Sequence, residues 1–160
     1  MDTIYQHLLD VLNSFDYTSS FSIQGSKRDK VKKLQNELCD ALKSSISSMT
    51  WETEHNMSSN YNDSADIFGW NNETQVIIEL DTTRADQVAK KMLSRFYYCF
   101  DTPTIYVSLL YPGTKKMNVH ECEKYFKYGK KILAGINKNA LFVGIILEQV
   151  EGMLSVNLTV

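Results

Sequence analysis

Three carboxylates stand in two apolar segments near the middle of the chain. Asp66 lies within residues 64–70, and Glu79 and Asp81 close residues 74–81. Carboxylate oxygens are the ligands that Mg²⁺ prefers, and a metal ion held by them can activate water for hydrolysis of a phosphodiester bond. These residues are therefore candidates for a metal-dependent catalytic site, provided that the fold gathers them.

The two segments are predicted to form an antiparallel β-hairpin. They meet at Asn71 and Asn72, and asparagine tolerates the positive φ angles of a tight turn. A two-residue turn at this point places Asp66 opposite Ile77. On that register Asp66 and Glu79 are diagonal neighbours with Cα atoms roughly 7–8 Å apart, so their side chains can converge on one ion.

The same register separates the two faces of the hairpin, because side chains alternate along a β-strand. One face carries an apolar set that suits a core, namely Ala65, Ile67, Gly69, Val76, Ile78 and Leu80. The other face carries Asp66, Glu79 and Asp81. Three carboxylates on one face repel one another unless water, a metal ion or basic side chains offset their charge. A strand face that is simply exposed to water explains these acids equally well.

A helix is predicted to follow the hairpin and to run to about residue 100. Thr82 or Thr83 can cap it, and apolar residues then recur at helical spacing. Its polar stripe, spaced at i, i+3, i+7 and i+11, comprises Arg84, Gln87, Lys91 and Arg95. Basic side chains next to the carboxylates can bind phosphate, although a solvated helix face shows the same pattern.

Hydrophobic periodicity predicts the remaining elements. Helices are expected at 3–14, 27–47 and 118–134, and strands at 49–57, 104–111, 140–148 and 153–159. With 160 residues, 43% of them hydrophobic, the chain has the length and composition of one folded domain. We therefore expect a single α/β domain.

Charge is distributed unevenly along the chain. Residues 49–83 hold seven acidic residues and no Lys or Arg, whereas residues 84–138 hold eleven basic and four acidic residues. This pattern suits a cation-dependent site for a polyanion, since carboxylates bind metal and basic groups bind phosphate. The three cysteines fit neither a disulfide framework nor a zinc site. No segment has the apolar length of a membrane span and no export signal is apparent, so we expect a cytoplasmic location and no membrane partner.

The hairpin and the helix after it resemble a known family. Asp66, Glu79 after twelve intervening residues within the run VIIELD at 76–81, and a helix starting at Arg84 resemble the PD-(D/E)XK nuclease superfamily. That superfamily has the restriction-endonuclease-like fold, whose αβββαβ core contains a mixed central sheet flanked by helices. The resemblance covers residues 27–111. It leaves residues 1–26 as a peripheral helix and loop, and residues 112–160 as an added helix and two strands.

The resemblance implies a Mg²⁺-dependent DNA endonuclease, with Mn²⁺ as an alternative metal. A restriction-type enzyme of this size would act on DNA as a homodimer, in which two copies cut the two strands. Asp66 and Glu79 would bind the metal. Asp81 occupies the position where the family usually has Lys, and it would add a metal ligand. Lys91, with Lys90 as the alternative, would then supply the missing charge from the helix.

Further residues are implied for the site and for DNA binding. Gln87 matches a Gln often found on that helix in the superfamily, and Glu37 resembles an extra acid that some members contribute. The basic helix stripe and a lysine row farther along the chain could follow a nucleic-acid backbone, and the candidates are Arg84, Lys91, Arg95, Lys115, Lys116, Lys124, Lys127 and Lys131.

Two other interpretations fit the same residues. A non-catalytic nucleic-acid-binding or assembly module would keep this fold while the missing motif Lys had cost it activity. An unrelated α/β protein would carry an acidic hairpin face that is merely solvated.

Overall fold

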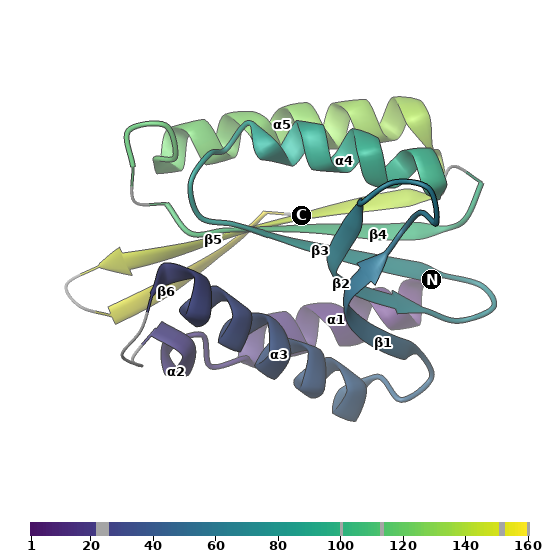
Figure 1. Cartoon of the computed structure of the whole chain (residues 1–160), viewed down its shortest axis with the longest axis horizontal. Helices are drawn as coiled ribbons and strands as arrows, with labels where there is room; N and C mark the ends of the chain where they lie inside the picture. The colour runs from purple at the N-terminus through teal and green to yellow at the C-terminus, as the bar shows by residue number, and fades with distance from the viewer. Residues whose placement is uncertain (22–25, 100, 113, 151–152, 160) are drawn as a thin grey trace.

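The computed structural model describes residues 1–21, 26–99, 101–112, 114–150 and 153–159. They form an α/β fold on one six-stranded mixed sheet, whose strands lie side by side in chain order (Figure 1). The strands are β1 (Thr50–Asn56), β2 (Ser64–Trp70), β3 (Gln75–Asp81), β4 (Thr104–Leu110), β5 (Ala140–Val150) and β6 (Met153–Thr159). The helices are α1 (Asp2–Ser14), α2 (Thr18–Phe21), α3 (Lys27–Ser45), α4 (Gln87–Tyr98) and α5 (Val119–Ile136).

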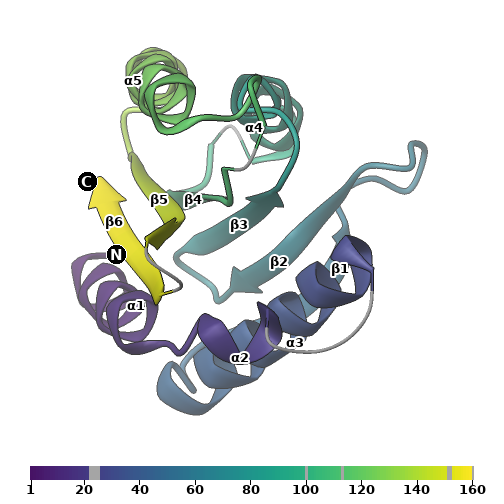
Figure 2. The ribbon, with the colours of Figure 1, turned by 90° about the vertical axis from the view of Figure 1, so that its left-hand side faces the viewer.

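Helices cover both faces of the sheet. Strands β3, β4 and β5 run parallel, and α4 and α5 provide the two crossovers between them. The pairs β1–β2, β2–β3 and β5–β6 are antiparallel. Figure 2 shows α4 and α5 on one side of the sheet and α1, α2 and α3 on the other. Because water is excluded from both faces of the centre, every residue of β4 is buried.

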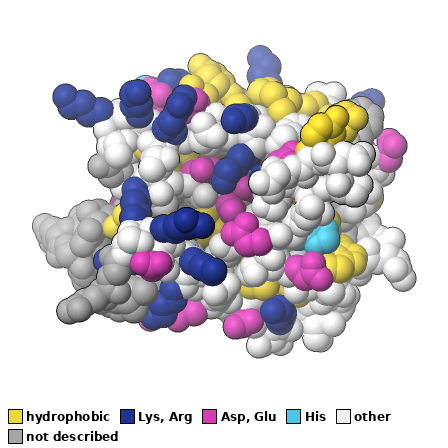
Figure 3. Space-filling view, viewed as in Figure 1, with side chains coloured by type: hydrophobic (Ala, Val, Ile, Leu, Met, Phe, Trp, Pro, Cys, Tyr) yellow, Lys and Arg dark blue, Asp and Glu magenta, His cyan; other side chains and the backbone are white. Residues whose placement is uncertain are grey.

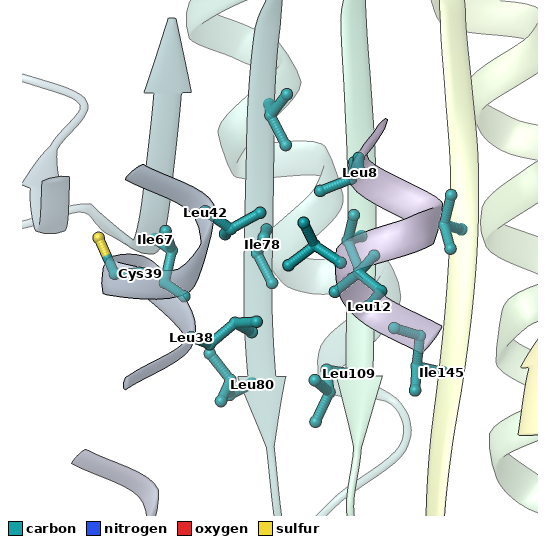
Figure 4. Packing of buried hydrophobic residues seen from close by; sticks show 14 of the residues in the cluster. Leu8, Leu12, Leu38, Cys39, Leu42, Ile67, Ile78, Leu80, Leu109 and Ile145 are labelled. Atoms are coloured by element: carbon teal, nitrogen blue, oxygen red, sulfur yellow. The ribbon is translucent and has the colours of Figure 1, made fainter. Parts of the chain in front are cut away.

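The apolar core on one face joins α1 and α3 to the sheet. Leu8 and Leu12 are one turn apart on α1, as are Leu38 and Leu42 on α3, and all four are fully buried. They point toward Ile78 and its neighbours on the strands (Figure 4). The N-terminal helix therefore belongs to the core, and the prediction of a peripheral helix within residues 1–26 is wrong.

A second core lies between the other face of the sheet and the two crossover helices. Met92 and Phe96 of α4 and Phe126 of α5 pack in one cluster with Ile77 and Tyr106 of the sheet. Because alternate residues of β3 and β4 serve the two cores, each strand needs apolar side chains on both faces. This packing fixes the position of α4 over β3, which matters for the site described below.

The predicted strands and the longer helices are confirmed to within a few residues. Helix α3 starts where expected because Ser26 caps it: its hydroxyl accepts a hydrogen bond from the N–H of Asp29, whose carboxylate accepts one from the N–H of Ser26. The short helix α2 replaces part of the loop expected within residues 1–26 after the first helix, and residues 22–25 of that loop lie outside the described residues.

The predicted start of the helix after the hairpin is wrong. Helix α4 begins at Gln87, after Asp86 in the N-cap position, and not at Arg84 or behind a threonine cap. The N–H of Ala85 instead donates to the carbonyl of Lys116, which ties this segment to the loop before α5. The order α3, β1, β2, β3, α4, β4 is nevertheless the predicted αβββαβ order.

Gly144 in β5 lies directly against the ring of Phe126 on α5. A Cβ atom at Gly144 would lie 2.4 Å from Cδ2 of Phe126, whereas a Cβ atom at Gly135 of α5 would meet no atom within 4 Å. We expect Gly144→Ala to destabilise the fold by roughly 1–3 kcal/mol. Gly135→Ala should be neutral or stabilising by up to about 1 kcal/mol, because alanine favours helix. Urea denaturation measures the unfolding free energy of each variant, and equal values for Gly144→Ala and Gly135→Ala would contradict this packing.

Candidate functional site

The hairpin that carries the carboxylates has a four-residue connection and not the predicted two-residue turn. Trp70 pairs with Gln75, and Ile67 pairs with Ile78. The side chain of Asn71 causes the difference, because its Oδ1 accepts the backbone N–H groups of Glu73 and Thr74 at 2.9 and 2.8 Å. The register is therefore shifted by two residues. The even shift preserves which side chains share a face.

The shift moves Asp66 from a diagonal position to one directly opposite Glu79. Regular pairing of β2 with β3 ends at Ile67 and Ile78, one step before these two acids. Beyond that point the Asp66 carboxylate takes the place of a backbone acceptor, since its Oδ2 accepts the N–H of Leu80 at 2.7 Å. The Asp66 side chain is therefore held at the point where the two strands separate.

Lys91 brings the three predicted carboxylates together. Its Nζ lies 3.2 Å from Oδ2 of Asp66, 2.9 Å from Oε2 of Glu79 and 3.3 Å from Oδ1 of Asp81. Lys91 lies on the second turn of α4, which places it above the end of β3. Lys90, the alternative, is exposed. The predicted convergence of the acids agrees with the structure, and of the two candidate lysines Lys91 is the one that lies beside them.

The site runs from a buried end to an open end. The side chain of Glu79 is 1% exposed, whereas those of Asp66 and Lys91 are 24% and 22% exposed. Solvent and a substrate can therefore reach the cluster from the Asp66 side. Figure 3 shows acidic side chains near the centre of this face of the molecule, with most of the Lys and Arg side chains above them and to their left.

Burial dominates the electrostatics of the acids. It raises the pKa of Glu79 to about 7, helped by the charge of Asp66 and opposed by Lys91 and Arg95. Burial likewise raises the pKa of Asp81 to about 6, against the effect of Lys91. Burial alone would lower the pKa of Lys91, but the three carboxylates outweigh it and raise that pKa above its ordinary value. Lys91 is therefore charged throughout the neutral range.

The acids of the site do not by themselves form a metal centre. Within the described residues, no group of three or more His, Cys, Asp and Glu side chains is placed so that it could hold a metal ion. Mg²⁺ does not need such a group, since it commonly uses one or two carboxylates together with waters and substrate phosphates. Oε2 of Glu79 is already engaged by Nζ of Lys91 at 2.9 Å, whereas Oδ2 of Asp81 is buried and accepts no hydrogen bond from the described part of the chain.

Arg95 is buried and holds Glu79 through a hydrogen bond, so its predicted role in DNA binding is wrong. Arg95 is only 5% exposed. Its Nε donates to Oε1 of Glu79 at 2.5 Å, and its other nitrogens donate to the carboxylate of Asp63 and to the carbonyl of Ser64. The polar stripe misled the prediction because two of its members, Lys91 and Arg95, lie against acidic side chains of the hairpin and of the loop before it, and not against water.

The other residues predicted for the site and for DNA binding lie around this centre. Gln87 is half-buried at the start of α4, one turn before Lys91. Arg84 is exposed and forms an ion pair with Asp86. Glu37 does not join the acids, because it pairs with Lys33 at 3.4 Å and accepts a hydrogen bond from Ser19 of α2.

The predicted lysine row is mostly on the surface. Lys115, Lys116, Lys127 and Lys131 are exposed. Lys124 is half-buried, with its Nζ 2.5 Å from Glu121 and 4.9 Å from the ring centroid of Tyr125. This lysine already has a local partner, so its charge is less available to a ligand than that of its neighbours.

Sequence reasoning missed the α3 side of the site. Gln35, which is 4% exposed, donates from Nε2 to the carbonyl of Asp66 and, at 3.1 Å, to Oε1 of Glu54. Glu54 reaches this side because its φ of 52° interrupts the alternation of β1. The sequence held one usable signal, the cluster of Lys and Arg at the start of α3.

Comparison of the chain with protein-family models, with curated proteins and with solved structures found no match. In the part of the chain that the structure describes, no helix is both long enough and apolar enough to cross a membrane.

Removal of Arg95 is expected to destabilise the fold. Arg95→Met leaves Glu79 and Asp63 without their buried partner, which should cost roughly 3–5 kcal/mol of unfolding free energy. The double variant Arg95→Met, Glu79→Gln should recover part of this loss, because it also removes the buried charge. Urea denaturation measures the effect. A loss under about 1 kcal/mol together with weaker DNA binding would show that Arg95 serves the ligand.

Stability without metal should depend on the proton of Glu79. Between its ordinary pKa of 4.5 and about 7, the folded state holds a proton that the unfolded state has released. Raising the pH through this range therefore lowers the unfolding free energy, by on the order of 3 kcal/mol from this group. In EDTA, Glu79→Gln should remove most of that decline. Denaturation curves from pH 5 to pH 8 test this prediction. An equal decline of unfolding free energy with pH in the wild type and in Glu79→Gln would contradict it.

Proposed function

We propose that this protein is a metal-dependent endodeoxyribonuclease related to the PD-(D/E)XK nucleases. The observation that carries the proposal is the convergence of Asp66, Glu79 and Asp81 on Nζ of Lys91 at the point where β2 and β3 separate. The αβββαβ order of the surrounding elements supports the same assignment.

In this proposal Asp66 and Glu79 hold Mg²⁺ or Mn²⁺, with Asp81 beside them. The bound ion would lower the pKa of a water molecule and offset the negative charge that develops on the phosphate. Arg95 keeps Glu79 in position through the Nε to Oε1 hydrogen bond. Asp66 is fixed by the N–H of Leu80, so both metal ligands are held before metal arrives.

Lys91 has the role of the lysine that the family usually places in its motif. Asp81 occupies that motif position, and the neighbouring helix supplies the ammonium group, within 3.3 Å of all three acids. With a divalent cation held by Asp66 and Glu79, the Lys91 ammonium would be free to contact the attacking water or a phosphate oxygen. Lys91 needs only to move its flexible side chain toward the open end of the site.

A second candidate function is a non-catalytic DNA-binding module of the same architecture. One observation favours it: Lys91 already offsets the carboxylates, so the cluster can persist as a structural ion-pair network. This function predicts DNA binding that does not lead to cleavage.

Incubation with supercoiled plasmid separates the two functions. We expect nicked and then linear product with Mg²⁺ or Mn²⁺, and intact plasmid with EDTA. Because one site cuts one strand, conversion to linear product should become efficient when two copies act together, as in a homodimer. Retention of DNA with no cleavage under any metal condition would favour the module and would contradict the nuclease.

A further inference from the structure

A basic pocket opens next to the carboxylates on the α3 side of the sheet. It has a volume of about 600 Å³, and its lining includes Lys27, Arg28 and Lys32 from the start of α3. Thr82 and Thr83, which follow β3, close it on the other side. Asp66 belongs both to this pocket and to the cluster around Lys91, so the pocket and the candidate metal site are contiguous.

The walls of this pocket are tied together by hydrogen bonds. Nζ of Lys27 donates to the carbonyl of Thr82, which joins α3 to the end of β3. Gln35 is buried and joins α3 to Asp66 and to Glu54. A ligand therefore enters a site whose walls are already in place, and little ordering of the backbone opposes binding.

The charge of the pocket suits an anion. Three cationic side chains, Lys27, Arg28 and Lys32, face two carboxylates, Glu54 and Asp66. A divalent cation on Asp66 would increase the excess of positive charge. Arg and Lys at this density bind phosphate groups, with Arg able to donate two parallel hydrogen bonds.

A basic track extends beyond the pocket. Oγ1 of Thr114 donates to the carbonyl of Thr83 at 3.3 Å, so the loop that carries Lys115 and Lys116 lies against the segment after β3. Both lysines are exposed. They line a second pocket together with Arg84, Asp86 and Glu121. A track of this kind suits successive phosphates of a polymer better than a single small anion.

We infer that the α3 pocket binds a backbone phosphate of DNA next to the phosphate that is cleaved, with Arg28 and Lys32 as its main contacts. This inference depends on the proposed nuclease function and adds the path of the substrate. The DNA strand passes from the α3 pocket across the open end of the site at Asp66 and on toward Lys115 and Lys116.

Fluorescence anisotropy with a labelled DNA duplex tests this path. Ca²⁺ replaces Mg²⁺ to slow cleavage during binding. The double variant Arg28→Ala, Lys32→Ala should bind roughly tenfold more weakly at low salt, and the slope of log affinity against log salt should become shallower by about 2. The matched control is Lys43→Ala, because Lys43 is an exposed lysine at the other end of α3, paired only locally with Asp40. It should bind like the wild type.

The possible results distinguish this inference from the proposed function. If the wild type cleaves plasmid and the double variant binds the duplex as tightly as Lys43→Ala, the pocket assignment is wrong and the nuclease remains. If inorganic phosphate at millimolar concentration binds the wild type more tightly than the double variant while both proteins bind the duplex equally, the pocket holds a small anion and the inference is wrong. If the wild type neither binds nor cleaves DNA, both proposals are wrong.

Discussion

Glu79→Gln is expected to lower the rate of metal-dependent DNA cleavage by roughly a thousandfold. Glutamine keeps the shape of glutamate and an oxygen that can accept the hydrogen bond from Nε of Arg95, but it lacks the negative charge that a divalent cation requires. Because the Glu79 side chain is only 1% exposed, no carboxylate from the solvent can reach its position and replace its charge. Initial rates of plasmid nicking in Mg²⁺ measure the effect.

The matched control for this experiment is Glu73→Gln. Glu73 lies in the connection of the same hairpin, where it is exposed. Its substitution changes the net charge by the same amount but does not touch the cluster, so its rate should equal that of the wild type. Asp66→Asn should lower the rate as Glu79→Gln does. Equal nicking by the wild type and Glu79→Gln would mean that this cluster does not catalyse the cleavage.

Lys91→Ala is expected to lower cleavage by roughly a hundredfold, because it removes the only cation within ion-pair distance of all three acids in the described structure. Lys90→Ala should have little effect, since Lys90 is exposed on the same helix. The comparison is direct because the two variants lose the same charge at neighbouring positions. Single-turnover rates at saturating Mg²⁺ measure both.

Stability provides a second measurement for Lys91→Ala. Without metal, the variant leaves Asp66, Glu79 and Asp81 facing one another without the ammonium group. It should be less stable than the wild type at pH 8, and Mg²⁺ should restore more stability to it than to the wild type.

The opposite order of cleavage rates, with Lys90→Ala slower than Lys91→Ala, would mean that the rotation of α4 described here is wrong.

The sequence predicted the framework of the site well, because the framework follows hydrophobic periodicity. Alternating apolar residues in β2 and β3 identified which face carries Asp66, Glu79 and Asp81, and the spacing of Lys91 placed it near them. These features depend on parity and helical spacing, which a shift of two residues in register leaves unchanged.

The parts that were not predicted depend on contacts between distant residues. The four-residue connection arises from the side chain of Asn71, and the burial of Arg95 arises from the packing of α4 against β3. The prediction assigned Arg95 to the surface because a polar stripe on a helix usually faces water. The α3 pocket was missed because Lys27 and Thr82 are far apart in the sequence and meet only in the folded chain.

Calorimetric titration with Mn²⁺ tests the central claim most directly, namely that the carboxylates around Lys91 form a divalent-cation site. The wild type should bind Mn²⁺ saturably at pH 8, whereas Glu79→Gln should bind at least roughly tenfold more weakly, and Glu73→Gln should match the wild type. Absence of Mn²⁺ binding by the wild type, or equal binding by Glu79→Gln, would contradict the account.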